Sequence, residues 1–228
     1  MKKLIFITAI LLVGMILPAQ EIFFPSKEGT VLVYKTFDKK DKETSMVRYT
    51  ITNLKVSGND MDITYQFESI DPKDKLVYKD EITIHKKGDM LYFDMSNFIN
   101  KAMFQQNGEI PADVKITGNS MEIPSNPKSG DILPDANVEM SVSMGIINMK
   151  MSANVTNRKV EDIEAITVKA GTFKAYKFSS DVNSSAMGMK FKTKSTEWYA
   201  KGVGVVKSEQ YDKNDKLQSY MELVEITK

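Results

Sequence analysis

Residues 61–67 read Met61-Asp62-Ile63-Thr64-Tyr65-Gln66-Phe67, a strict alternation of apolar and polar side chains. Because successive side chains of a strand point to opposite faces, this period of two predicts a strand with one buried face. The same alternation recurs in runs joined by short polar turns: Thr30–Phe37, Thr44–Val56, Leu76–His85, Val114–Ile123, Val138–Met144, Ile147–Val160, Phe173–Val182, Lys190–Tyr199, Val205–Tyr211 and Leu217–Ile226. We therefore expect an all-β fold, an antiparallel meander curled into a barrel- or clam-like sheet that hides its edges.

Three of the turns share the pattern apolar-Asp-x-x-Asp-Lys, at residues 37–42, 70–75 and 211–216. The first Asp can accept a hydrogen bond from the backbone two residues on, and the second Asp tolerates the left-handed conformation of a bulged hairpin. A calcium loop is the alternative, but Lys lies among the would-be ligands and no Glu stands at the closing position. The pattern therefore predicts hairpin turns, with positive φ at or next to Asp41, Asp74 and Asp215.

One segment has the periodicity of a helix. Apolar side chains recur at helical spacing at Met95, Phe98, Ile99, Ala102 and Met103. Asp94 is placed to cap the start, and Gly108 follows the end. We expect a short amphipathic helix within Met95–Gln106 that covers an end of the sheet, with a mobile lid over a ligand as the alternative.

Residues 1–20 have the features of a secretory signal peptide. A positive start at Lys2 and Lys3 precedes an apolar run, Leu4–Leu17, which Pro18-Ala19-Gln20 follows. The run is shorter than the roughly 20 residues that a membrane-spanning helix needs. We expect cleavage after Ala19 or Gln20 and, since no Cys follows the run, no lipoprotein anchor. The expected product is a single β domain over residues 21–228, exported to the periplasm or the outer surface, with a proline-rich waist at 124–136.

Charge and composition exclude several classes of function. The chain has 31 basic and 30 acidic residues, so it has no general attraction to nucleic acid or anionic lipid. It has no Cys, and His85 is its one histidine, so the usual parts of a zinc site or a nucleophilic triad are missing. Ser125-Asn126-Pro127-Lys128 matches a Ser-x-x-Lys string, but Pro127 inside it and the lack of a Lys-Thr-Gly indicate coincidence. We expect no cofactor and no metal.

Methionines cluster on the apolar faces of the later strands. Met140 and Met144 share a face of one predicted strand, Met149 and Met151 share a face of the next, and Met189 begins a third stripe. With Phe98 and Met103 of the predicted helix, these side chains are candidates for lining an apolar ligand cavity. Plain core packing is the favoured interpretation, because Met is an adaptable core filler. A Cu(I) thioether site is disfavoured, because no His or Cys accompanies the pairs.

Trp198 departs from the face pattern of its strand. Counting from Phe191 in steps of two reaches Tyr199, so Trp198 falls on the face of Lys190, Lys192 and Lys194. Either a bulge near Ser195 and Thr196 changes the register, or Trp198 covers the other side of the sheet. In both cases we expect a buried structural side chain.

Two segments carry a family resemblance: Arg158–Glu161 leading to Thr167–Lys177, and Glu197–Lys207. They resemble the TapB-like family of secreted Bacteroidota proteins, a domain of unknown function. The resemblance covers Val155–Ile226, and the early strand Gly29–Tyr34 also fits. It implies an exported β domain in the periplasm or at the outer surface, and it supplies no catalytic residues.

The expected function is that of an exported, non-enzymatic envelope protein that binds a protein partner or an apolar ligand through a curved β scaffold. A structural accessory of a secreted assembly is one alternative, and it would need an exposed apolar patch or an open strand edge. A hydrolase of envelope polymers is the other, and it would need two carboxylates that converge in a cleft. The sequence singles out no such pair of acids.

Overall fold

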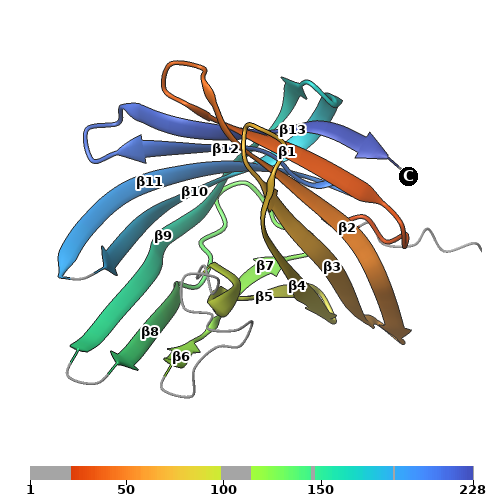
Figure 1. Ribbon diagram of the computed structural model, residues 1–228. Helices are drawn as coiled ribbons and strands as arrows, with labels where there is room; N and C mark the ends of the chain where they lie inside the picture. The colour runs from red at the N-terminus through yellow and green to blue at the C-terminus, as the bar shows by residue number, and fades with distance from the viewer. Residues whose placement is uncertain (1–21, 99–113, 145–146, 187, 228) are drawn as a thin grey trace, which may run out of the picture.

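The computed structural model of the chain describes residues 22–98, 114–144, 147–186 and 188–227. The predicted signal peptide lies outside these ranges, as does most of the predicted helix. The described part of that helix is a single turn of 3-10 helix, η1 (Met95–Phe98). Within the described ranges the chain forms thirteen strands, which pair into one antiparallel, nearly closed barrel (Figure 1). The all-β fold class is therefore confirmed.

The strands follow one another along the chain as β1 (Val31–Asp38), β2 (Glu43–Ser57), β3 (Asp60–Ile70), β4 (Leu76–Lys87), β5 (Met90–Asp94), β6 (Val114–Gly118), β7 (Ser120–Pro124), β8 (Ala136–Met144), β9 (Ile147–Val168), β10 (Gly171–Ala186), β11 (Met189–Ala200), β12 (Gly204–Asp212) and β13 (Leu217–Thr227). Their order in the sheet is β6-β8-β9-β10-β11-β12-β13-β1-β2-β3-β4-β5-β7. Most neighbours in the sheet are neighbours in the sequence, as in a meander. The exceptions are the pairing of β13 with β1, which joins the two halves, and the two ends of the sheet.

The prediction of one strand over Val114–Ile123 is wrong, because this segment is divided between the two ends of the sheet. β6 pairs with β8 and β7 pairs with β5, although Asn119 alone separates β6 from β7. Gly118 allows the close approach: a Cβ there would lie 2.3 Å from the carbonyl oxygen of Asn137. Asn119 then accepts the Asn137 N–H on Oδ1 at 2.7 Å and donates from Nδ2 to the Asp135 carbonyl at 3.1 Å.

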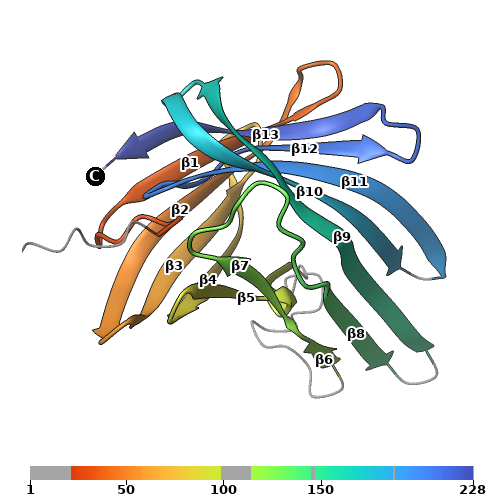
Figure 2. The ribbon, with the colours of Figure 1, turned by 180° about the vertical axis from the view of Figure 1, so that it is seen from behind.

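The predicted waist at 124–136 is a strap that lies along β9. The Gly130 N–H donates to the Val160 carbonyl at 2.7 Å, and the Leu133 N–H donates to the Arg158 carbonyl at 2.9 Å. The Arg158 side chain is buried, and it donates to the carbonyl oxygens of Pro134 at 2.6 Å and Glu122 at 2.9 Å. Arg158 therefore fastens β7 and the strap to β9, where the two ends of the sheet approach each other (Figure 2).

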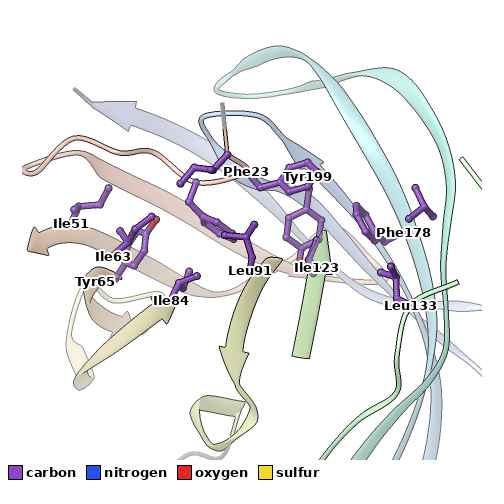
Figure 3. Packing of buried hydrophobic residues seen from close by; sticks show 13 residues of the cluster. Phe23, Ile51, Ile63, Tyr65, Ile84, Leu91, Ile123, Leu133, Phe178 and Tyr199 are labelled. Carbon is purple, nitrogen blue, oxygen red and sulfur yellow. The ribbon is translucent and has the colours of Figure 1, made fainter. Parts of the chain in front are cut away.

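Phe23 lies at the centre of the inner core, just after the predicted signal peptide. Its ring is fully buried and meets Tyr176, Phe178 and Tyr199 edge to face, at centroid distances of 5.1, 6.1 and 5.9 Å. Figure 3 shows Phe23 with side chains from both halves of the sheet around it. Packing of this kind adds about 0.5–1.5 kcal/mol per pair to the burial of apolar area.

A second core covers the outer face of the sheet around Trp198. The tip of the β9–β10 hairpin folds over this face, and the Ala170 N–H donates to the Leu223 carbonyl at 3.2 Å. Trp198 Nε1 donates to Glu164 Oε1 at 2.7 Å, and the Lys177 ammonium lies 5.4 Å from the centre of the indole. Trp198 is therefore buried on the opposite side of the sheet from Tyr199. The pairing of β11 with β12 shifts register between these two residues.

The three Asp-x-x-Asp-Lys turns have one geometry. The second Asp of each turn has positive φ, as predicted: 60° at Asp41, 59° at Asp74 and 60° at Asp215. The first Asp of each turn accepts backbone N–H groups two and four residues on, at 2.8 and 3.1 Å for Asp38, 2.8 and 2.9 Å for Asp71, and 2.8 and 3.0 Å for Asp212. These bonds satisfy the backbone of a tight hairpin and leave no carboxylate arrangement suited to calcium.

Asp74→Gly should leave the free energy of unfolding unchanged or slightly raised, because Gly adopts positive φ without a Cβ penalty. Asp74 is the clearest test, since Asp41 also accepts the Tyr220 hydroxyl and Asp215 also pairs with a lysine. Urea denaturation measures the effect. Asp71→Ala, which removes the acceptor of two N–H groups, should cost about 1 kcal/mol. A loss above about 1 kcal/mol for Asp74→Gly would mean that its carboxylate has a further role.

Arg158→Lys should lower the free energy of unfolding by about 2 kcal/mol or more. The single ammonium group of lysine cannot reproduce the two hydrogen bonds that the planar guanidinium donates to separate carbonyl oxygens. The Arg48→Lys variant is the matched control. Arg48 is 42% exposed and forms a 3.2 Å ion pair with Glu68, so the same change there should cost well under 1 kcal/mol. Equal losses in the two variants would show that Arg158 does not hold the sheet closed.

Candidate functional site

Side chains of the described residues line at least two cavities inside the barrel. The larger has a volume of about 260 Å³ and the smaller about 190 Å³. They share Met121, Glu197 and Tyr199 in their walls. The two spaces therefore adjoin at these side chains, of which Met121 is the most flexible.

Aromatic rings line much of the larger cavity: Phe24, Tyr34, Tyr49, Tyr65, Phe93 and Tyr199. They form a nearly continuous series of contacts, with centroid distances of 5.7 Å from Tyr34 to Tyr49, 6.1 Å from Tyr49 to Tyr65 and 6.4 Å from Tyr65 to Phe24. Burial raises the pKa of Tyr49 to about 12 and raises the pKa values of Tyr34 and Tyr65 as well. These hydroxyl groups therefore stay neutral at any physiological pH.

The Tyr65 hydroxyl is buried without a hydrogen-bond partner among the described residues. Buried polar groups are almost always hydrogen-bonded, and an unsatisfied one costs about 1–3 kcal/mol. Tyr65 belongs to the wall of the larger cavity. Its oxygen has almost no accessible surface, so a bound molecule would satisfy it after a small movement of the neighbouring side chains.

Glu197 lies on β11 between the two cavities. Its Oε2 accepts a hydrogen bond from the Tyr199 hydroxyl at 3.0 Å. Burial raises the pKa of Glu197, while the Tyr199 hydrogen bond and the charge of Arg158 act in the opposite direction. Burial likewise lowers the pKa of Arg158, which lines the smaller cavity. The interior therefore combines apolar walls with a half-buried acid, Glu197, and a buried guanidinium, Arg158.

The predicted methionine site is only partly assembled. Met140, Met151 and Met189 fall in one cross-strand row, because Met140 pairs with Met151, and Ala186 pairs with both Met151 and Met189. Met140 is buried, whereas Met189 is 58% exposed. Neither cavity has Met140, Met149, Met151 or Met189 in its wall. Met103 and the side chains of Phe98 and Met144 lie outside the described residues.

Other residues line the cavities in their place. The methionines in the cavity walls are Met95, Met121 and Met221, from η1, β7 and β13. Glu197 was not predicted, although a signal for it exists. The step of two that runs from Phe191 to Tyr199 passes through Glu197, which is a charged residue at an inward-facing position.

The remaining candidates form no site. His85 Nδ1 lies 2.6 Å from Asp62 Oδ1, and its side chain is 44% exposed. Ser125 is fully buried, and the Lys128 N–H donates to Asp131 in the turn that follows it. In the part of the chain that the structure describes, no three side chains gather as metal ligands, and no helix is long and apolar enough to cross a membrane.

Comparisons with known proteins relate the chain to others of its fold. A family model described as DUF3108-like matches residues 27–223. A candidate exported protein with a YmcC-like fold from Bacteroides fragilis is 22% identical, with a TM-score of 0.75 over 91% of this chain and 100% of that one. A candidate lipoprotein from Parabacteroides distasonis is 25% identical, with a TM-score of 0.75 over 91% of this chain and 99% of that one. No curated protein matches, and the TapB-like resemblance stays a prediction.

Glu197→Gln should stabilise the protein at neutral pH. A carboxyl group whose pKa is raised by folding contributes stability below its ordinary pKa of 4.5, and that contribution is lost as pH rises through the raised value. The amide keeps an acceptor for Tyr199 and cannot ionise. The melting temperature of the variant should therefore exceed that of the wild type near pH 7–8, and the difference should disappear near pH 4.

Glu139→Gln serves as the control, because Glu139 is 54% exposed on the outer face of β8. Its melting temperature should follow that of the wild type throughout. Thermal unfolding monitored by circular dichroism at several pH values measures both variants. If Glu197→Gln is less stable than the wild type at pH 8, the carboxylate is ionised and satisfied in the fold.

Proposed function

We propose that this member of the DUF3108-like family holds a small apolar ligand in its interior. The family model matches residues 27–223, which include almost the whole sheet. The protein acts as a non-enzymatic binding protein of the cell envelope, in the periplasm or at the outer surface. The signal-peptide pattern of residues 1–20 supports this location, as do the relatives described as candidate exported protein and lipoprotein.

The observation that carries the proposal is the aromatic cavity. Side chains just fill the interior of a barrel of about eight strands, and the diameter grows with the number of strands, which is thirteen in the described ranges here. Here a volume of about 260 Å³ stays open beside apolar walls from both halves of the sheet. Small-molecule sites commonly have volumes of roughly 300–1,000 Å³, and the adjoining cavity beyond Met121 brings the interior into that range.

A carboxylate-based hydrolase is the second candidate, because Asp94 and Glu197 both line the larger cavity. Two observations favour binding instead. Asp94 Oδ1 accepts the Ser96 N–H at 2.8 Å at the start of η1. The walls between the acids are mainly apolar rings, whereas two-carboxylate hydrolysis needs a positioned water and a polar substrate subsite. Hydrolysis of envelope polysaccharide that is lost in both Asp94→Asn and Glu197→Gln would overturn the non-enzymatic proposal.

Protein purified from the envelope should carry a ligand, and native mass spectrometry should detect it as added mass that organic solvent removes. The emptied protein should bind a fluorescent apolar probe saturably. Val205→Phe places a larger side chain in the cavity wall, so it should lower the affinity for the probe by about tenfold or more. Val56→Phe is the matched control, because Val56 is 61% exposed on β2. No bound mass and no saturable binding in the wild type would reject the proposal.

A further inference from the structure

Among the described residues, the charged side chains in the wall of the larger cavity are Asp94 and Glu197, and both are acids. Asp94 is exposed, whereas Glu197 lies between the two cavities. A molecule that enters therefore meets a negative potential, strengthened by the low polarity of the surrounding side chains.

The carboxylate of Glu197 has no ion pair among the described residues. Its hydrogen bond comes from the neutral Tyr199 hydroxyl. Arg158 influences Glu197 electrostatically, but its own N–H groups donate to the carbonyl oxygens of Pro134 and Glu122. A cation in direct contact would offset the cost of desolvating this half-buried carboxylate. No side chain of the described residues pairs with Glu197 as that cation, and Glu197 lines the larger cavity.

The rest of the wall suits the same kind of group. Aromatic rings attract cations through the negative potential of their faces, and such contacts are worth about 2 kcal/mol or more when they are shielded from water. The unpartnered Tyr65 hydroxyl can accept one further hydrogen bond. Leu32, Ile84 and Val205 complete the lining with aliphatic surface, which suits a hydrocarbon body rather than a second charge.

We propose that the larger cavity binds an amphipathic organic cation, with its ammonium group beside Glu197 and the aromatic rings and its apolar body against the aliphatic wall. This inference rests on the proposed function and narrows the ligand to one chemical class. The shared chemistry is that of primary and quaternary ammonium groups, and Tyr65 separates the two. A primary ammonium donates a hydrogen bond to the hydroxyl, whereas a quaternary ammonium has no N–H to donate.

Four amphiphiles with the same ten-carbon chain test the proposal: decylamine, decyltrimethylammonium, decanol and decyl sulfate. Each is titrated by calorimetry into delipidated full-length protein, below the concentration at which it forms micelles. The two cations should bind at least tenfold more tightly than decanol, and decyl sulfate should bind most weakly. Glu197→Gln should abolish the preference for cations and retain the affinity for decanol, whereas Glu139→Gln on the outer face should retain both.

The outcomes separate this inference from the proposed function. Equal affinity for the four amphiphiles, or a cation preference that survives Glu197→Gln, would overturn the cationic ligand while leaving an apolar binding site. The absence of binding for all four would overturn both. Tyr65→Phe should lower the affinity for decylamine several-fold and leave the affinity for decyltrimethylammonium unchanged. An equal loss of affinity for both cations would show that the hydroxyl does not bind the ammonium group.

Discussion

A sheet of thirteen strands can bury its inner face only if its two ends meet, and here they meet without pairing to each other within the described residues. The guanidinium of Arg158 connects them in place of hydrogen bonds between paired strands. It reaches from β9 to the backbone of β7 and to the strap that leads into β8, and satisfies a carbonyl oxygen on each. Burying a charge is costly, and the hydrogen bonds to the two carbonyl groups offset part of that cost while they hold the two segments in place.

This mode of closure also determines what the interior can be. A barrel closed by a regular ladder needs no charge inside, whereas this one places Arg158 in the wall of the smaller cavity. Glu197 interacts with it electrostatically and partly balances its charge. The larger cavity begins on the other side of this pair, where no basic residue of the described segments joins the acid in the wall. The polarity of the interior therefore changes from one cavity to the other.

Alternation along the sequence was sufficient to predict the fold class and most strands, because the inner face of a curled sheet needs an apolar residue at every second position. It failed where this rule was locally absent. β5 contains the continuous apolar run Met90-Leu91-Tyr92-Phe93, which has no period of two. The separation of β6 from β7 did leave a trace: inward positions are even at Ile116 and odd at Met121, so the phase of the alternation changes at the break.

The cavity was harder to predict than the sheet around it. Period two correctly placed Val138, Met140 and Val142 on one buried face, but a buried face does not reveal where its side chains fail to meet. The open space depends on how rings from β1, β2, β3 and β11 pack after the sheet curls. These rings are far apart in the sequence, so no local pattern predicts how they pack. The charged residue at an inward position, Glu197, was the one local sign of it.

The single residue between β6 and β7 has a consequence for how the chain folds. Asn119 ties together two strands whose partners, β8 and β5, belong to opposite ends of the sheet, so neither end can be completed before the other is near. We expect closure to come late in folding, after most of the hairpins exist, because it carries the entropic cost of joining distant segments. Until then both edges of a long apolar sheet are exposed to other chains, and a protein of this topology is most prone to aggregate in that interval.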